Sequence, residues 1–286
     1  MPPQSAAAVT PKDGRALLSL MTRAAEAAAH VIRDATPRRA ALEWEEKGVA
    51  DFVTEVDRDA ESRAVEIIRM QEPQAEFLAE ESANQSSIAT LQSRLENRHS
   101  PNRISPLFVI DPLDGTTNFL HGLPEYAVSI AAMVGGQLAA AIVLNVPRNE
   151  CFTAISGIGA WLGDAPMHVS AIKNPQRALI GTGFPFKTPS DIPHYLPQIA
   201  KVMEATSGVR RPGAASIDLA HVAAGRLDGF WENYLSPWDV AAGILLIREA
   251  GGVCTDAAGK DSSVAFGGIV AGNPVIHEWL LRTIGD

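Results

Sequence analysis

The sequence predicts an α/β protein in which layers of helices alternate with sheets, and three observations favour this class. Residues 12–35 repeat apolar side chains at the spacing of an amphipathic helix. Residues 107–110 form an apolar run of strand length. Further runs of that length lie within 126–155, where glycine and proline separate them. Beyond residue 170, strand-like and helix-like segments alternate again, as they do in α/β folds.

The length of 286 residues suits one large α/β domain or two smaller ones, and 46% hydrophobic residues suffice for a sizeable core. We expect a loose N-terminal tail over residues 1–11, because prolines gather there and no helical pattern begins. A single domain follows over residues 12–286. Its N-terminal α+β lobe spans about 12–169 and its C-terminal α/β lobe about 170–286.

Composition excludes several classes of function. The net charge of −9 argues against broad nucleic-acid binding through phosphate contacts. Cys151 and Cys254 lie far apart in no metal-binding pattern, so we expect free thiols and a cytoplasmic protein. The apolar run 127–146 has the length of a membrane span, but Gly135-Gly136 interrupts it and favours a hairpin of two strands. We therefore expect no membrane association.

The N-terminal elements follow from local patterns. After the helix over 12–35, residues 42–53 indicate a hairpin or mobile loop. A second helix begins at Thr54 and runs to about residue 70. Residues 77–82 form a short strand that runs into two acids. The polar segment 83–104 is expected to be an exposed loop or flap with at most one helical turn.

The remaining elements alternate more regularly. An antiparallel meander is expected over 126–133, 137–145, 151–155 and 157–161. The second lobe is predicted to contain a strand over 178–183, helices over 192–207, 215–224 and 240–250, and an aromatic strand over 228–232. Gly225 ends the second of these helices, and Asp239 occupies the N-cap position of the third.

The most specific stretch of the chain is Asp111–Asn118, which follows the apolar run 107–110. Asp111 ends a buried strand, and Pro112 cannot donate to the sheet, so the chain turns through residues 113–115. Asp111 and Asp114 can then converge on one point as hard oxygen ligands of the kind that Mg²⁺ prefers. The N–H groups of Gly115, Thr116 and Thr117 would face the same point as a phosphate cradle.

Each acidic residue also has a simpler interpretation. Asp-Pro and Asp-Gly are common turn dipeptides, so Asp111 and Asp114 would bond only their own backbone. Asp57 stands three residues after Thr54, where it would complete a capping box. Asp239 would be a helix cap, and paired acids such as Glu80 and Glu81 are usually solvated. The residues alone leave these alternatives open.

Four segments in agreeing order decide between them. They are Val53-Thr54-Glu55-Val56-Asp57, Glu80-Glu81-Ser82, the octet Asp111–Asn118, and Trp238-Asp239-Val240-Ala241-Ala242-Gly243. Together they resemble the inositol monophosphatase family, whose members are Mg²⁺-dependent, Li⁺-inhibited phosphomonoesterases. The resemblance covers nearly the whole chain from about residue 12. It implies a layered αβαβα sandwich of the inositol monophosphatase / fructose-1,6-bisphosphatase type, with the site between two lobes, and a homodimer.

The resemblance also implies roles for individual residues. Asp111 bridges two Mg²⁺ ions, Glu80 and the carbonyl of Leu113 complete the first metal site, and Asp114 and Asp239 hold the second. A third, weaker ion at Glu80 is left open. Thr116, polarised by Asp57, orients the attacking water, so the catalytic set is Asp57, Glu80 and Thr116. The substrate-binding residues are Asp114, Gly115, Thr116, Thr117, Gly213, Ala214, Ala215 and Glu232.

The expected substrate is myo-inositol 1-phosphate or a related sugar or polyol phosphate, because Glu232 would accept hydrogen bonds from hydroxyl groups. Fructose bisphosphate, histidinol phosphate and phosphoadenosine phosphate are the alternatives. Some bacterial relatives associate with the transcription machinery, so a regulatory partner of that kind is a further alternative. Three departures from the family pattern stand out: Ala79 in place of a glycine, the missing hydroxyl at Ala214, and the long segment 83–104.

Overall fold

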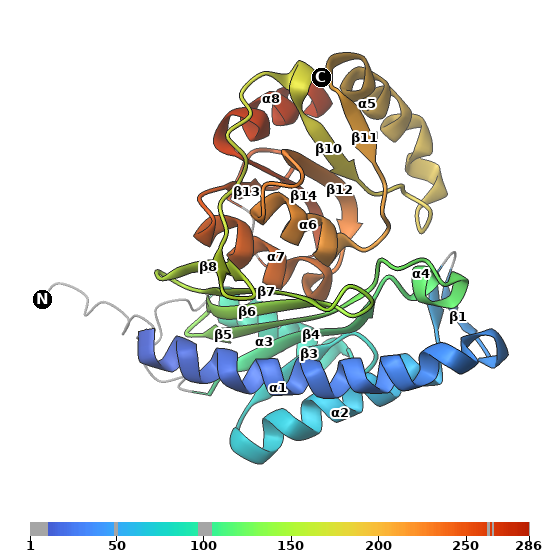
Figure 1. The fold of residues 1–286 in the computed structure, drawn as a ribbon, viewed down its shortest axis with the longest axis vertical. Coiled ribbons are helices and arrows are strands. Elements are labelled where there is room, and N and C mark those ends of the chain that lie inside the picture. The colour runs from blue at the N-terminus through green and yellow to red at the C-terminus, as the bar shows by residue number, and fades with distance from the viewer. Residues whose placement is uncertain (1–10, 49–50, 97–104, 262–263, 265, 286) are drawn as a thin grey trace, which may run out of the picture.

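The computed structural model describes residues 11–48, 51–96, 105–261, 264 and 266–285. It has five layers, helices–sheet–helices–sheet–helices (Figure 1). The predicted αβαβα arrangement is therefore confirmed. The tail expected over residues 1–11 lies outside the described residues except for Pro11, which begins α1. Residues 97–104 of the predicted flap also lie outside them.

The larger sheet has seven strands in the order β3-β4-β5-β6-β7-β8-β9. β3 and β4 are parallel, and the other neighbours are antiparallel. Its strands are β3 (Glu76–Ala79), β4 (Leu107–Asp114), β5 (Ala127–Val134), β6 (Gln137–Asn145), β7 (Glu150–Ile155), β8 (Gly159–Leu162) and β9 (Ala165–Pro166). Gly135 and Gly136 both have positive φ, which joins β5 to β6 in the predicted hairpin.

The smaller sheet has five strands in the order β11-β10-β12-β14-β13. β10 is parallel to both its neighbours, and β14 is antiparallel to both of its own. Its strands are β10 (Leu179–Thr182), β11 (Gly208–Arg210), β12 (Gly229–Leu235), β13 (Val253–Thr255) and β14 (Gly267–Gly272). A two-stranded hairpin of β1 (Glu45–Gly48) and β2 (Asp51–Val53) stands apart from both sheets, as the sequence predicted for 42–53.

Helices cover both sheets and separate them. The helices are α1 (Pro11–Ala35), α2 (Glu55–Gln71), α3 (Gln85–Glu96), α4 (Thr116–His121), α5 (Ile192–Ala205), α6 (Ala215–Ala223), α7 (Pro237–Glu249) and α8 (Pro274–Gly285), and three short 3₁₀ helices lie over Thr36–Ala41, Pro175–Arg177 and Pro189–Asp191. α1 and α2 cover one face of the larger sheet, α6 and α7 fill the space between the sheets, and α5 and α8 cover the outer face of the smaller one (Figure 1). The central pair is apolar almost all round, as expected for helices buried on two sides.

Two predicted elements need correction. Residues 85–96 form a helix of 12 residues in place of an exposed loop. Ile88, Leu91 and Leu95 recur at helical spacing, and their contact with the core outweighs the polar composition around them. α7 begins at Pro237, earlier than predicted, so Ser236 is its N-cap and Asp239 is the third residue of the helix. Proline is favoured at the first helical position because its missing N–H is not needed there.

A membrane span was not expected, and none of the helices built from the described residues combines the length and apolar character that crossing a bilayer requires.

Candidate active site

The site is built around the end of β4. The ladder between β4 and β5 shifts register between Asp111 and Asp114, where Pro112 has no N–H to donate. Asp111 Oδ1 accepts a hydrogen bond from the backbone N–H of Leu113 at 3.0 Å, which stabilises the turn. The local interpretation of Asp111 is therefore correct, but it uses one side-chain oxygen only. The backbone then enters α4 through Gly115 at φ 88°, where a Cβ would lie 2.8 Å from the carbonyl oxygen of Glu125.

Three carboxylates meet at this turn, two from the turn itself and one from the distant helix α7. Asp111, Asp114 and Asp239 each offer an oxygen, and these oxygens all lie within 4.8 Å of one another. A cavity of about 400 Å³ opens above them. Glu80, at the end of β3, lines the same cavity, because β3 lies parallel to β4 and delivers its carboxyl end to the same edge. All four of the acids singled out in the sequence line this cavity, and three of them form one cluster.

Burial and mutual repulsion govern the electrostatics of this cluster. Burial, followed by the charges of Glu80, Asp114 and Asp239, holds the pKa of Asp111 well above its ordinary value. The pKa of Asp239 is raised well above its ordinary value by the same two causes. Burial raises the pKa of Asp114 to about 6, although its hydrogen bonds from Ser216 oppose the shift. Such a group of acids is stable in ionised form only beside compensating positive charge.

The donor set fits a divalent cation. All the side chains offer carboxylate oxygens, and Leu113 lines the same cavity. The described residues place no histidine or cysteine within this group, which disfavours zinc and other softer ions. The charges that raise each other's pKa values are the charges that a bound cation would neutralise. The chemistry of the donor set therefore matches a hard, oxygen-loving metal such as Mg²⁺.

Asp57 supports Thr116 from behind the cavity. Asp57 Oδ2 accepts from the N–H of Thr54 at 2.9 Å and from its hydroxyl at 2.6 Å, so the predicted capping box is present. The other oxygen, Oδ1, lies 2.9 Å from Thr116 Oγ1. The same hydroxyl lies 3.0 Å from the Leu113 carbonyl. Its one proton is thus committed to acceptors, which leaves an oxygen lone pair for a third group. The helix-capping contacts with Thr54 and the contact with Thr116 use different oxygens of Asp57, so both are present together.

Two helices of the central layer anchor the acids. Ser236 caps α7 and donates its N–H to Asp239 Oδ2 at 2.6 Å, which fixes that carboxylate in the first turn of the helix. At the start of α6, Ser216 binds Asp114 Oδ2 with its N–H at 2.8 Å and its hydroxyl at 2.5 Å. Each carboxylate keeps a second oxygen for the cavity. The second lobe therefore holds one acid itself and positions another from the first lobe.

Glu232, on β12, also lines the cavity. Its carboxylate lies directly over Gly183, where a Cβ would come within 1.8 Å of the carboxyl carbon. Burial raises the pKa of Glu232 to about 8, with Arg211 opposing the shift. Glu232 is therefore no solvated surface acid. Gly213 and Ala215 also line the cavity, as predicted, but Ala214 does not: it is buried between them and packs into the core.

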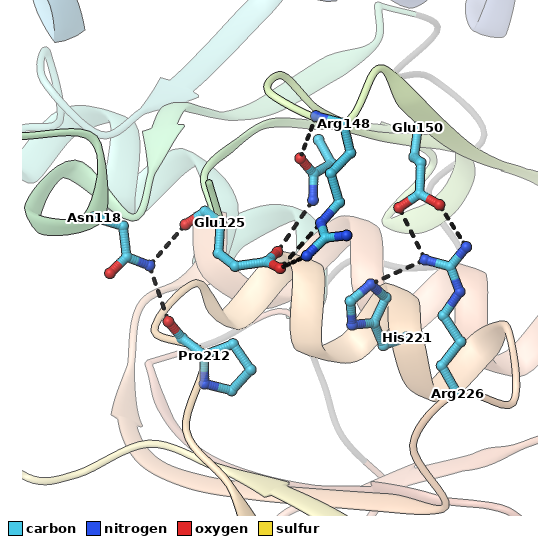
Figure 2. Close-up of polar contacts among 8 residues, drawn as sticks. Asn118, Glu125, Arg148, Glu150, Pro212, His221 and Arg226 are labelled. Atoms are coloured by element: carbon cyan, nitrogen blue, oxygen red, sulfur yellow. Dashed lines mark hydrogen bonds and ion pairs between the residues drawn. The ribbon is translucent and has the colours of Figure 1, made fainter. Parts of the chain in front are cut away.

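The loop that carries Gly213 is tied to the first lobe. Figure 2 shows Asn118 between the two lobes: its Nδ2 donates to the carbonyl oxygen of Glu125 at 2.7 Å and to that of Pro212 at 3.0 Å. Arg148 in turn fixes the Glu125 carboxylate, with its Nε at 3.0 Å. Asn118 is buried and lies on α4, directly after Thr116 and Thr117. Its amide therefore holds the loop that carries Gly213 against α4.

Comparisons with known proteins identify the family of this chain. The model of the inositol monophosphatase family matches residues 14–286. The chain belongs to the inositol monophosphatase family. It is a phosphatase of this family, and the predicted resemblance is confirmed.

Relatives carry two kinds of name. The Nus factor SuhB of Pseudomonas aeruginosa is 43% identical over 270 residues, which cover 94% of this chain and 95% of that protein. The inositol-1-monophosphatase of Rhizobium meliloti is 43% identical over 238 residues, covering 83% of this chain and 84% of that protein. The crystal structure of extragenic suppressor protein suhB from Bartonella henselae superposes with a TM-score of 0.84 at 39% identity, covering 94% of this chain and 98% of that one.

Sequence reasoning missed several residues of this inositol monophosphatase site. Ser216, which binds Asp114, follows the Gly-Ala-Ala segment and gave no signal of its own. Arg211 and Lys187 line the cavity, and their charges lower the pKa of Glu232. Asp218 lines it as well. An acid in the first turn of an apolar helix was the available signal for Asp218, because such a helix has no solvated face to accept it.

We predict that Glu232 makes the metal-free protein less stable as pH rises. The pKa of Glu232 is about 8 in the folded protein against an ordinary value of 4.5, so between these values the folded state binds a proton that the unfolded state has lost. The free energy of unfolding therefore falls across this interval. Melting temperatures in a chelating buffer at pH 5 and pH 8 should drop less for Glu232→Gln than for the wild type.

The matched control is Glu204→Gln, which removes a solvent-exposed acid on α5 and should leave the wild-type profile unchanged. Parallel pH profiles for the wild type and Glu232→Gln would contradict the raised pKa.

Proposed function

We propose that this protein hydrolyses the phosphate ester of a polyol, with myo-inositol 1-phosphate as the preferred substrate, by attack of a metal-activated water. The observation that carries the proposal is a single cavity lined by two kinds of group. One is the acids grouped around Asp111, with Thr116. The other is Glu232, which can accept hydrogen bonds from hydroxyl groups.

Glu80, Asp111, the Leu113 carbonyl, Asp114 and Asp239 are proposed to hold two Mg²⁺ ions, with a third at Glu80. Bound there, the ions would supply a water of lowered pKa and neutralise negative charge on the leaving oxygen. Asp111 would contribute to both sites, because the charges of Glu80, Asp114 and Asp239 all act on it. Hydrolysis of phosphate monoesters is among the slowest uncatalysed reactions, so charge neutralisation of this extent is required.

The protein groups orient the reactants. Thr116, with its proton committed, accepts a hydrogen bond from the attacking water and holds an oxygen lone pair of that water toward phosphorus. Gly115, Thr116 and Thr117 line the cavity where the phosphate would lie. Gly213 and Ala215 form the wall beside the leaving group, and Glu232 accepts from its hydroxyls.

The substrate alternatives differ in what Glu232 would face. Fructose bisphosphate is a polyol as well, whereas histidinol phosphate and phosphoadenosine phosphate present fewer hydroxyls to a carboxylate acceptor. The homodimer and the cytoplasmic location expected from the sequence stay predictions.

Activity is predicted to require Mg²⁺ and to be inhibited by Li⁺. Phosphate release should be measured on a panel of these monoesters, with and without exhaustive chelation. Asp111→Asn should abolish turnover on every ester while leaving the metal-free protein at least as stable, because it removes one of several mutually repelling carboxylates. Undiminished turnover after chelation would rule out the metal mechanism. A large fall in the melting temperature of metal-free Asp111→Asn would mean that this residue is structural.

Asp57→Asn is predicted to slow the reaction with little effect on metal affinity. Replacing the acceptor of the Thr116 proton misorients the attacking water, which costs on the order of 10²–10⁴-fold in kcat. The comparison is kcat and the Mg²⁺ concentration for half-maximal activity, wild type against variant. Full turnover in Asp57→Asn would leave Asp57 only its helix-capping role.

A second function is favoured by the relatives called Nus factor SuhB, which are 40–43% identical to this chain over 270 residues. We propose that this protein also associates with the transcription machinery, independently of phosphate hydrolysis. Tagged wild type and Asp111→Asn should retain RNA polymerase equally from an extract of the source cells, because the change lies inside a cavity. Retention by neither would exclude this role.

A further inference from the structure

Asp218 is a buried acid in the active-site cavity that the proposed chemistry does not use. It lies in the first turn of α6, is 1% exposed, and lines the cavity together with Glu232. Its Oδ1 is buried and has no hydrogen-bond partner among the described residues. Ser216, on the same turn, donates both its N–H and its hydroxyl to Asp114, so neither group is available to Oδ1 of Asp218.

A purely structural role does not account for this arrangement. An acid in the first turn of a helix is stabilised by the helix dipole, and it has this stabilisation while exposed to water. Burying a polar atom without a partner costs more than the dipole supplies, and the cost rises further if the atom is charged. The packing of α6 therefore gains nothing from a carboxyl at Asp218 that an apolar residue of similar size would not supply better.

The surroundings of Asp218 favour its protonated form. Burial holds the pKa of Asp218 well above its ordinary value, and the charges of Glu232 and Asp114 reinforce the shift. Arg211 opposes it. A protonated carboxyl both donates and accepts hydrogen bonds, which matches a hydroxyl group better than a carboxylate does.

Arg211 contacts two aromatic rings. Its guanidinium lies 5.6 Å from the ring centre of Phe184 and 5.2 Å from that of Phe186, and both rings are exposed and line the cavity. Besides the acidic cluster, two further carboxyl groups line the cavity, Asp218 on α6 and Glu232 on β12.

We propose that Asp218 is a second specificity-determining residue, which together with Glu232 binds neighbouring hydroxyl groups of a polyol leaving group. The inference rests on the proposed phosphatase function. It adds that the protein binds two hydroxyl groups of the substrate, one with each of these side chains. A leaving group with two adjacent hydroxyls can satisfy both side chains at once, whereas an ester with one hydroxyl or none leaves the buried oxygen of Asp218 without a partner.

The test compares binding of two non-hydrolysable ligands by calorimetry in the presence of Mg²⁺. These are the phosphonate analogue of myo-inositol 1-phosphate, which presents a ring of hydroxyls, and ethylphosphonate, which presents none. The proteins are wild type, Asp218→Ala, Asp218→Asn and Glu232→Gln. The control is Asp228→Asn, which alters another buried acid whose carboxylate binds Ser170 and the N–H of Leu179 outside the cavity.

Asp218→Ala should weaken binding of the inositol phosphonate about tenfold relative to ethylphosphonate, the loss expected for one hydrogen bond of about 1.4 kcal/mol. Asp218→Asn should stay within about threefold of wild type, because an amide also donates and accepts. Asp228→Asn should lower the melting temperature and leave the affinity ratio unchanged. An unchanged affinity ratio in Asp218→Ala, or equal losses in Asp218→Ala and Asp218→Asn, would overturn the inference.

Two arrangements keep the result interpretable. If Asp218→Ala does not fold, the isosteric Asp218→Leu carries the same expectation, because it also lacks hydrogen-bonding groups. Failure of the proposed function is seen separately, as absence of turnover by the wild type on the corresponding phosphate esters. The binding ratio is measured without turnover, so it tests Asp218 whichever way the activity assay falls.

Discussion

The repulsion between buried carboxylates at the end of β4 is the constraint on which the rest of this structure depends. Asp111, Asp114 and Asp239 lie within a few ångströms of one another in surroundings that raise all their pKa values. An arrangement of this kind is unfavourable unless something holds each acid in place. The fold supplies rigid supports: a strand interrupted by Pro112, and the first turns of two buried helices. A bound cation would relieve this repulsion and so stabilise the folded protein.

The five-layer architecture brings these supports together. α6 and α7 lie between the two sheets, so their N-termini reach the carboxyl edge of the larger sheet and the end of β12 at once. Ser216 and Asp239 therefore act from the second lobe on a site founded in the first. Asn118 closes the arrangement by binding both lobes with one amide group. The hydrogen bonds of Ser216 and Asn118 both position the site and hold the packed elements together. Buried polar side chains are tolerated here because they are hydrogen-bonded.

The cavity also separates two tasks. The acids near β4 are suited to a phosphate group and a bound metal ion. Glu232, Asp218 and Arg211 line the same cavity and are suited to the alcohol part of the ester. A relative named as a Nus factor and one named as a phosphatase are both 43% identical to this chain, over 270 and 238 residues respectively.

The family and the layered fold could be predicted from the sequence, because turn chemistry and short motifs are encoded by neighbouring residues. Asp57 could be assigned to a capping box, and Gly135-Gly136 to a hairpin, from a few residues each. The tertiary structure decided what depends on distant contacts. Residues 85–96 are polar overall, yet three apolar side chains meet the core and make them a helix. α7 begins at Pro237, so its N-cap is Ser236 and not Asp239. The unpartnered oxygen of Asp218 and the position of Glu232 over Gly183 became visible only when α6, β10 and β12 were brought together, since no local pattern records which buried acid lacks a partner.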